Sequence, residues 1–276
     1  MHDNMENLFD IKGRTVVMTG ASGVLGSVIV KYFALQGCNV ALLCRECSEA
    51  KCRTLVEEIA ADRGEAAYFV CDVMDESSLA AVRDKILEQY GTIDILLNGV
   101  GGNMGPANVG PDQTIFDMDV EATRKVLDIN LFGVIIPTRV FASAMTGCGK
   151  GSIVNFCSMS SFRPLTRVCG YGMAKSALLS WTQWLAGELA LKFGDGIRVN
   201  AIAPGFILTN QNRSLLTNPD GSLTDRSHKI LSHTPYGRFL QADEMCGALH
   251  YLASDASKAV TGTVLAVDGG FSSFSI

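Results

Sequence analysis

Short apolar runs alternate along the chain with longer stretches in which apolar residues recur every three or four positions. The short runs are nearly continuous in Val, Ile, Leu and Ala, which is typical of strands buried on both faces. They predict strands at residues 14–19, 39–44, 66–71, 93–97, 152–157, 197–203 and 264–267. The longer stretches have helical spacing and predict helices at residues 24–36, 48–63, 77–90, 121–145, 171–193 and 241–253.

This alternation of strands with helices predicts parallel βαβ units. The fold class that follows is α/β, a Rossmann-type doubly wound parallel sheet of about seven strands with helices on both faces. No shift in composition marks an interdomain linker, so we expect a single domain over residues 1–276, with residues 1–10 as an N-terminal tail. Two long segments without a clear period, residues 99–120 and 204–235, are expected to be loops that bind or cover the substrate.

Composition narrows the class of protein. With 47% hydrophobic and 18% charged residues, the chain can bury a core, which argues against disorder. A net charge of −5 and the lack of a Lys/Arg cluster argue against nucleic acid as a partner. We find no uninterrupted apolar run of ~20 residues and therefore expect no membrane span.

Cysteine usage and the N-terminal residues favour a cytoplasmic location. The 9 cysteines are irregularly spaced, unlike a disulfide framework, and the first predicted strand is preceded by acidic residues rather than by the apolar core of a signal peptide. Cys44 and Cys47 form a C-x-x-C pair, but no further residues with zinc-ligand spacing accompany it. We therefore expect no metal site.

A glycine-rich turn lies between the first predicted strand and the first predicted helix, where residues 19–26 read T-G-A-S-G-V-L-G. Glycines there permit a tight turn and let a pyrophosphate approach the backbone at the positive N-terminus of the helix. A strand-to-helix turn can also use glycine for steric reasons alone. The strand before and the helix after favour nucleotide binding.

The residues at the end of the second predicted strand indicate which cofactor is preferred. An NAD site usually places a carboxylate there to hold the ribose 2′-hydroxyl, whereas this chain has Cys44 followed by Arg45. A guanidinium can bind a 2′-phosphate through paired hydrogen bonds. We therefore favour NADP(H) over NAD(H), the alternative being a solvated arginine at the end of a strand.

A third constellation joins Ser158, Tyr171 and Lys175. Tyr171 and Lys175 share one face of a predicted helix, and Ser158 follows a predicted strand. A neighbouring ammonium favours a tyrosinate, and a fall of about three units in the pKa of the phenol corresponds to ~4 kcal/mol. We expect Tyr171 to act as a general acid/base near neutral pH, with Ser158 hydrogen-bonding the reacting oxygen.

Together these motifs resemble the short-chain dehydrogenase/reductase family over residues 11–271. The resemblance implies that Asn130 completes a catalytic tetrad with Ser158, Tyr171 and Lys175. It implies a cofactor site formed by Gly20, Ser22, Gly23, Leu25, Gly26, Arg45, Asp72, Val73, Asn98, Gly99, Tyr171, Lys175, Pro204, Gly205, Ile207 and Thr209. Val24 stands where the family turn usually has glycine, which puts the geometry of the turn in question.

Several further segments resemble the D-mannonate oxidoreductase (fructuronate reductase) branch of that family, including residues 23–26, 161–166, 204–213 and 233–235. This resemblance implies a keto sugar acid as substrate. An anionic polyol needs a cation and several hydrogen-bonding groups near the reacting carbon. The candidates are Asn103, Arg163, Gln211, Asn212 and Arg213. Salt bridges between loops or subunits are the alternative role for the arginines.

The leading hypothesis is an enzyme that transfers hydride between NADP(H) and a small polar ketone, with a ketouronate such as D-fructuronate as the expected substrate. The alternatives are reduction of another carbonyl, such as a 3-oxoacyl thioester or another sugar or polyol, and a catalytically silent dinucleotide sensor. The family resemblance also implies a homodimer or homotetramer formed through the helices at residues 121–145 and 171–193.

Overall fold

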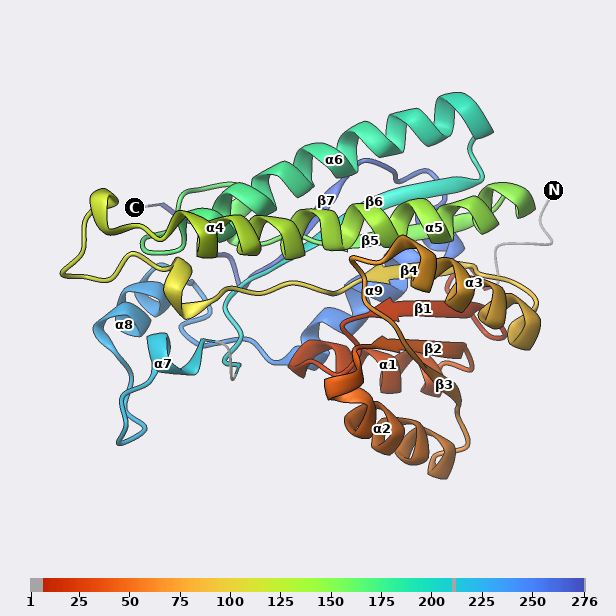
Figure 1. The fold of residues 1–276 in the computed structure, drawn as a ribbon, viewed down its shortest axis with the longest axis horizontal. Helices are drawn as coiled ribbons and strands as arrows, with labels where there is room; N and C mark the ends of the chain where they lie inside the picture. Colours follow the sequence, from red (N-terminus) through yellow and green to blue (C-terminus); the bar gives the residue numbers. More distant parts are fainter. Residues whose placement is uncertain (1–6, 210–211, 276) are drawn as a thin grey trace.

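The computed structural model describes residues 7–209 and 212–275. Seven parallel strands form one sheet, the number that the sequence predicts, and they lie in the order β3-β2-β1-β4-β5-β6-β7 (Figure 1). The strands are β1 (Thr15–Thr19), β2 (Asn39–Cys44), β3 (Glu65–Val70), β4 (Ile95–Asn98), β5 (Gly151–Phe156), β6 (Ile197–Pro204) and β7 (Val264–Val267). Helices cover both faces, so the doubly wound α/β fold is confirmed.

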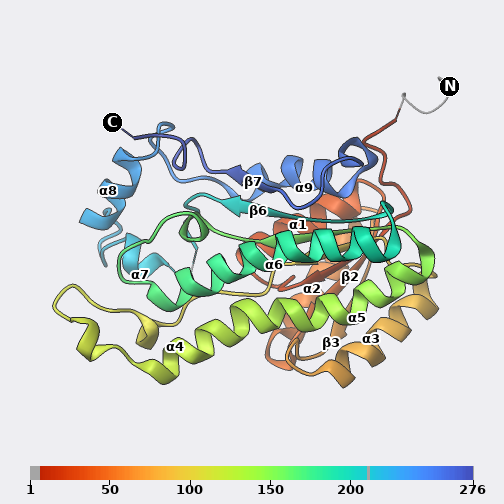
Figure 2. The ribbon, with the colours of Figure 1, turned by 90° about the horizontal axis from the view of Figure 1, so that it is seen from above.

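Alternate residues of each strand point to opposite faces, and in the five inner strands both faces are buried, whereas the edge strands β3 and β7 are partly exposed. In β1, Val16 and Met18 pack against α1 (Val24–Leu35), α2 (Glu49–Ala61) and α9 (Cys246–Ala253). Val17 packs on the other face with α3 (Glu76–Tyr90), α5 (Gly133–Cys148) and α6 (Cys169–Phe193). Figure 2 shows α3, α5 and α6 on one side of the molecule and α9 on the other.

The helix predicted at residues 121–145 is interrupted. α4 (Val120–Leu127) passes into one π-helical turn (Asp128–Phe132) before α5 begins. The side chain of Asn130 donates a hydrogen bond to the carbonyl oxygen of Val126, four residues earlier, and this turn places Asn130 in the interior. The prediction of one regular helix was therefore wrong at this turn, because apolar spacing does not report a single inserted residue.

The segment Val120–Cys148 is long and apolar enough to cross a membrane, but half of its most apolar window is buried inside the molecule. Phe141 and Met145 are fully buried against the sheet. The segment is a core helix.

The two long segments expected to be loops contain short helices. Residues 204–235 include α7 (Arg213–Leu216) and α8 (Asp225–Ser232), so the expectation of an irregular segment was wrong there. Thr224 accepts a hydrogen bond from the backbone N–H of Ser227 and begins α8, whose Ile230 is buried. Single 3-10 turns occur at Glu46–Ser48, Gly105–Ala107, Ile115–Asp117, Met159–Ser161, Ala242–Met245 and Asp255–Ser257.

The order of the strands determines where a ligand can bind. β1 lies between β2 and β4, and the chain leaves β1 toward one side of the sheet and β4 toward the other. A crevice forms outside the carboxyl ends of the strands at such a switch point. The segments that follow β1, β4, β5 and β6 all start at this edge.

Candidate active site

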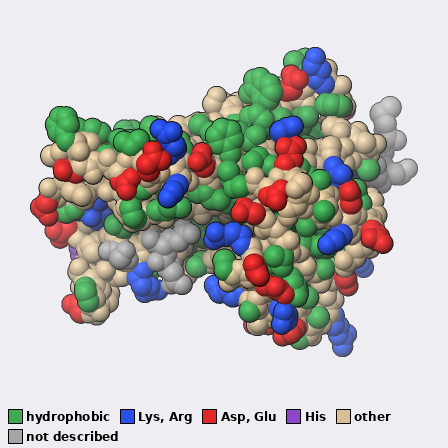
Figure 3. All heavy atoms as spheres, in the orientation of Figure 1, with side chains coloured by type: hydrophobic (Ala, Val, Ile, Leu, Met, Phe, Trp, Pro, Cys, Tyr) green, Lys and Arg blue, Asp and Glu red, His purple; other side chains and the backbone are tan. Residues whose placement is uncertain are grey.

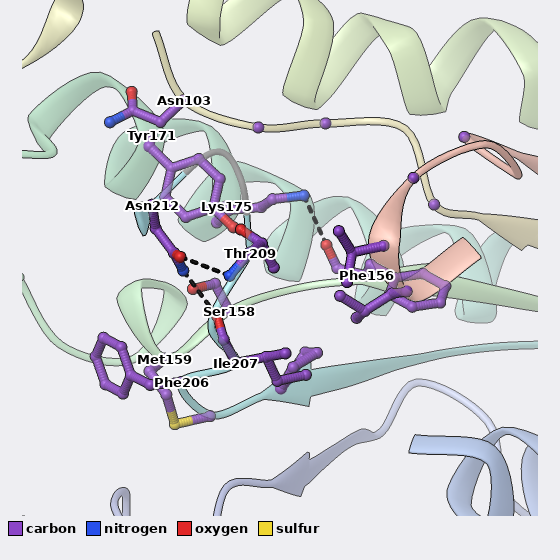
Figure 4. A pocket seen from close by; sticks show the side chains of 18 of the residues that line it. Asn103, Phe156, Ser158, Met159, Tyr171, Lys175, Phe206, Ile207, Thr209 and Asn212 are labelled. Atoms are coloured by element: carbon purple, nitrogen blue, oxygen red, sulfur yellow. Dashed lines mark hydrogen bonds between the residues drawn. The ribbon is translucent and has the colours of Figure 1, made fainter. Parts of the chain in front are cut away.

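A cavity of about 430 Å³ lies at the carboxyl edge of the sheet. Its wall includes Gly20 after β1, Gly99 after β4, Ser158 after β5 and Gly205 after β6. Tyr171 and Lys175 enter it from α6, and α7 and α8 complete the far side. The glycine-rich turn therefore shares one cavity with Ser158, Tyr171 and Lys175, whose side chains Figure 4 shows.

The glycine-rich turn brings two backbones close together. Gly20 has φ +70°, and a Cβ there would lie 2.7 Å from the carbonyl oxygen of Gly99. A Cβ on Gly26 would lie 2.3 Å from the carbonyl oxygen of Gly20, so the first turn of α1 can pack closely only with glycine. Val24 is the first residue of α1, partly exposed and lining the cavity. The valine therefore leaves the turn intact.

Ser158 and Lys175 are positioned by hydrogen bonds between the end of β5 and α6. The ammonium of Lys175 donates to the carbonyl oxygen of Phe156, with an Nζ to O distance of 2.7 Å (Figure 4). Ser161 accepts a hydrogen bond from the N–H of Ser158 at 3.2 Å and donates to the carbonyl oxygen of Lys175 at 2.8 Å. These contacts fix the position of Ser158 relative to Lys175.

Burial is the main cause of the pKa shifts of Tyr171 and Lys175. Nζ of Lys175 lies 5.6 Å from the centre of the Tyr171 ring. Burial raises the pKa of Tyr171, while the hydroxyl of Ser158 acts in the opposite direction. Burial also lowers the pKa of Lys175 to about 8. The pKa of Tyr171 is therefore raised rather than lowered as expected, because its removal from water dominates.

Asn130 lies beside Lys175. Its amide accepts a hydrogen bond from the N–H of Gly102 at 2.9 Å and donates to the carbonyl oxygens of Gly102 and Val126 at 2.6 and 2.8 Å. A Cβ on Gly101 would lie 2.5 Å from Oδ1 of Asn130 and 3.2 Å from Nζ of Lys175. The two polar side chains therefore converge on this stretch of backbone after β4.

Comparison with known proteins places this geometry in a family. A family model for enoyl-(acyl carrier protein) reductases matches residues 20–272. The uncharacterized oxidoreductase UxuB of Bacillus subtilis is 39% identical over 100% of this chain and 98% of its own length. The chain belongs to the short-chain dehydrogenase/reductase family.

Two solved structures are similar over nearly the whole chain. A Haemophilus influenzae protein provisionally assigned as a D-mannonate oxidoreductase, with bound NAD, is 39% identical with a TM-score of 0.89, covering 96% of this chain and 97% of that one. A gluconate 5-dehydrogenase from Burkholderia cenocepacia, in complex with NADP and tartrate, is 29% identical with a TM-score of 0.85, covering 97% and 98%.

The enzyme is an NAD(P)-dependent oxidoreductase that acts on a CH–OH group of a small molecule with NAD(P)⁺ as acceptor. Its cavity fits such a cofactor, since glycine backbone at the start of α1 forms one wall and leaves room for a pyrophosphate. The cavity is lined by nine of the predicted cofactor residues besides Tyr171 and Lys175: Gly20, Gly23, Leu25, Gly26, Gly99, Pro204, Gly205, Ile207 and Thr209.

Other predicted cofactor residues lie outside this cavity. Arg45 and Asp72 are exposed after β2 and β3, and a carboxylate oxygen of Asp72 accepts a hydrogen bond from the N–H of Met74 at 2.9 Å. Ser22 and Val73 also follow β1 and β3 without lining the cavity. Asn98 is fully buried and does not line the cavity, and its amide donates to Thr138 and Asn155.

The predicted substrate residues divide in the same way. Asn103 and Asn212 line the cavity, whereas Arg163 and Arg213 do not. Arg163 is exposed and donates a hydrogen bond to the carbonyl oxygen of Ser272 at 2.6 Å, which links two loops. Arg213 is exposed on α7. Gln211 lies outside the described residues.

Asn212 has a structural task. Its amide accepts from the N–H of Thr209 and donates to the carbonyl oxygen of Ile207, each at 2.8 Å (Figure 4). In Asn103, by contrast, the buried Oδ1 has no hydrogen-bond partner among the described residues, while Nδ2 donates to Asn108 at 2.5 Å. A substrate hydroxyl can satisfy this acceptor.

Sequence reasoning missed two cations that line the cavity, Lys51 and Arg226. Lys51 lies on α2 and its ammonium is 3.5 Å from the carbonyl oxygen of Ser22. Arg226 lies in the first turn of α8. Lys51 and Arg226 reach the cavity only because α2 and α8 fold toward it. Neither residue is adjacent to a recognisable motif.

Charge and metal chemistry elsewhere are unremarkable. Basic and acidic side chains are interspersed over the face shown in Figure 3. Within residues 7–209 and 212–275, no group of three or more His, Cys, Asp and Glu side chains could hold a metal ion. The 9 cysteines are all free thiols.

Proposed function

We propose that the enzyme reduces a small keto sugar acid of the D-fructuronate type to the corresponding hydroxy acid of the D-mannonate type. The observation that carries the proposal is the shared cavity, which brings Ser158, Tyr171 and Lys175 beside a dinucleotide-binding turn. Two relatives support the choice of substrate, because one is provisionally assigned to D-mannonate and the other is named for gluconate.

In this proposal Tyr171 is the general acid that donates a proton to the oxygen of the substrate carbonyl. Its raised pKa keeps the phenol protonated at neutral pH, as reduction requires. Ser158 donates a hydrogen bond to the same oxygen, and Lys175 stabilises the tyrosinate that forms. Asn130 holds the Gly102 backbone beside Lys175. The bound nicotinamide supplies the hydride.

A sugar acid carries hydroxyl groups that can donate to Asn103, which lines the cavity. The Oδ1 atom of Asn103 is buried and has no hydrogen-bond partner among the described residues, and leaving such an acceptor unpaired costs about 1–3 kcal/mol. A polyol removes this penalty, whereas an alkyl chain leaves it in place. The site therefore favours a hydroxylated substrate over an acyl chain.

We further propose a preference for NADP(H), because two cationic side chains lie between the carboxyl end of β2 and the first turn of α2. Arg45 is exposed immediately after β2, and Lys51 lines the cavity near Ser22. Neither forms a salt bridge among the described residues. A 2′-phosphate would satisfy both cations.

We also propose one domain, a cytoplasmic location and a homodimer or homotetramer. The candidate interface is the outer surface of α4, α5 and α6. Trp184 is 57% exposed there and stacks on Trp181 with ring centres 5.3 Å apart, whereas Leu185 belongs to the core of its own chain.

A ketone panel tests the function. We expect NADPH-dependent reduction of D-fructuronate to exceed that of a 3-oxoacyl thioester and of uncharged ketones in kcat/KM. The thioester is the main competitor, since a 3-oxoacyl-[acyl-carrier-protein] reductase of Thermotoga maritima is 32% identical over 94% of this chain. Turnover of uncharged ketones without turnover of uronates would reject a sugar acid as the substrate. Dinucleotide binding without turnover of any ketone would favour a sensor.

A further inference from the structure

One arginine on the wall of the cavity has no assigned task. Arg226 lies in the first turn of α8, partly buried, and lines the cavity that contains Tyr171 and Ser158. Its guanidinium donates two hydrogen bonds, and both go to Thr166, one to the hydroxyl and one to the carbonyl oxygen. Because a guanidinium has five N–H donors, three remain for a ligand.

No acidic side chain of the described residues lies within salt-bridge distance of Arg226. The charged side chain that acts on its pKa is instead Arg167, a second cation. Burial and the charge of Arg167 both lower the pKa of Arg226. Two neighbouring positive charges without a counter-ion repel each other. An anion bound in the cavity beside Arg226 would offset this repulsion.

The surroundings strengthen such an interaction. The neighbouring wall of the cavity contains the apolar side chains of Leu165, Leu215 and Leu216. α8 is held against α7 by a hydrogen bond from the hydroxyl of Ser227 to the carbonyl oxygen of Leu216, so the arginine has a defined position. A charge pair on an apolar wall interacts more strongly than one in open water.

We propose that Arg226 binds the carboxylate of the substrate and thereby selects keto sugar acids over neutral ketoses. The assignment rests on the proposed function, since it needs an acidic substrate at Tyr171. Arg167 supports the positive potential from the adjoining loop. Arg163 and Arg213, which the sequence favoured for this task, do not line the cavity.

The test uses two substrates that differ only in one group, D-fructuronate and D-fructose, in which a hydroxymethyl group replaces the carboxylate. For R226Q we expect the ratio of kcat/KM for D-fructuronate to that for D-fructose to fall about 100-fold, because truncating one partner of a charged pair has effects of this order. The loss should appear mainly in KM, since the carboxylate is remote from the reacting carbonyl.

Three variants serve as controls. R213Q removes an exposed arginine of the same segment and should leave the ratio unchanged. T166V removes the hydroxyl partner of Arg226 but keeps the cation, and it should also retain the ratio. R226K keeps a charge without the paired geometry and should lower the ratio about tenfold. Cofactor affinity and the melting temperature of each variant check that it is folded.

The outcomes separate the two claims. If the wild type prefers D-fructuronate and R226Q keeps that preference, the role of Arg226 is rejected and the proposed function stands. If the wild type reduces D-fructose as well as D-fructuronate, the proposed function is rejected and this assignment with it. Should R226Q fail to fold, R226K decides, and an unchanged ratio in R226K overturns the assignment.

Discussion

The two ends of the cavity are built in different ways. At the cofactor end the wall is backbone, formed where Gly20 approaches Gly99 at the carboxyl ends of neighbouring strands. At the substrate end the wall is made of side chains, including Asn103 and Arg226, which come from the long segments after β4 and β6. A backbone wall requires particular residues at particular turns, whereas a side-chain wall depends on how distant segments fold together.

This difference explains which residues of the cavity wall can be predicted from the sequence. The glycines of the turn lie next to a strand and a helix that their own sequence predicts, and they line the cavity. The sequence favours Arg163 because it follows the strand that ends near Ser158, yet its side chain donates a hydrogen bond to the carbonyl oxygen of Ser272. Arg226 reaches the cavity because α8 folds back against α7.

The largest effect is expected where the two ends meet, at Tyr171. Y171F removes the proton donor but keeps the ring, so kcat should fall by about 10²–10⁴-fold while cofactor affinity stays near that of the wild type. Steady-state kinetics and dinucleotide titration measure the two quantities. Near-normal turnover in Y171F would reject Tyr171 as the general acid.

The backbone wall is tested by adding one methyl group. G20A forces a Cβ to within 2.7 Å of the Gly99 carbonyl oxygen at φ +70°, so we expect cofactor affinity to fall at least about tenfold along with some stability. Gly91 offers a matched control, since it has φ +80° but open space around it. G91A should lose stability through backbone strain alone and bind the cofactor normally. Equal cofactor affinity in G20A and G91A would contradict the close approach.

The charge that stabilises the tyrosinate is tested by pH. Burial lowers the pKa of Lys175 from its ordinary value of 10.5 to about 8, so the ammonium is present below pH 8 and is lost above it. If the ammonium is needed, kcat/KM for reduction should decline about tenfold per pH unit above pH 8. K51Q, which removes a lysine from the cofactor end, should keep this decline. A profile that stays flat to pH 10 would show that the charge of Lys175 is not required.

The smallest expected effect concerns the cofactor preference. R45A should lower the ratio of kcat/KM for NADPH to that for NADH about tenfold, because one charge-assisted contact to a phosphate is lost. Arg53, which pairs with Glu49 on the outer face of α2, supplies the control. R53A should leave the ratio unchanged, and an unchanged ratio in R45A as well would remove the argument for NADP(H).

The sequence by itself determined the seven strands and the longer helices between them, because strands buried on both faces must be continuously apolar and the helices must have one apolar face. β2 and β7 have the bounds predicted for them. The turn at Gly20 and the presence of Tyr171 and Lys175 on one helix could also be predicted, since each depends on residues within a few positions.

Tertiary structure alone decided the rest. The π-helical turn at Asn130 exists because its amide reaches the backbone of Gly102, 28 residues away along the chain. The raised pKa of Tyr171 and the lowered pKa of Lys175 come from burial, which depends on everything packed around them. The choice of Arg226 over Arg163 depends on the path of α7 and α8 across the cavity. Contacts between distant segments and the exclusion of water are properties of the whole fold, and no local pattern of residues reports them.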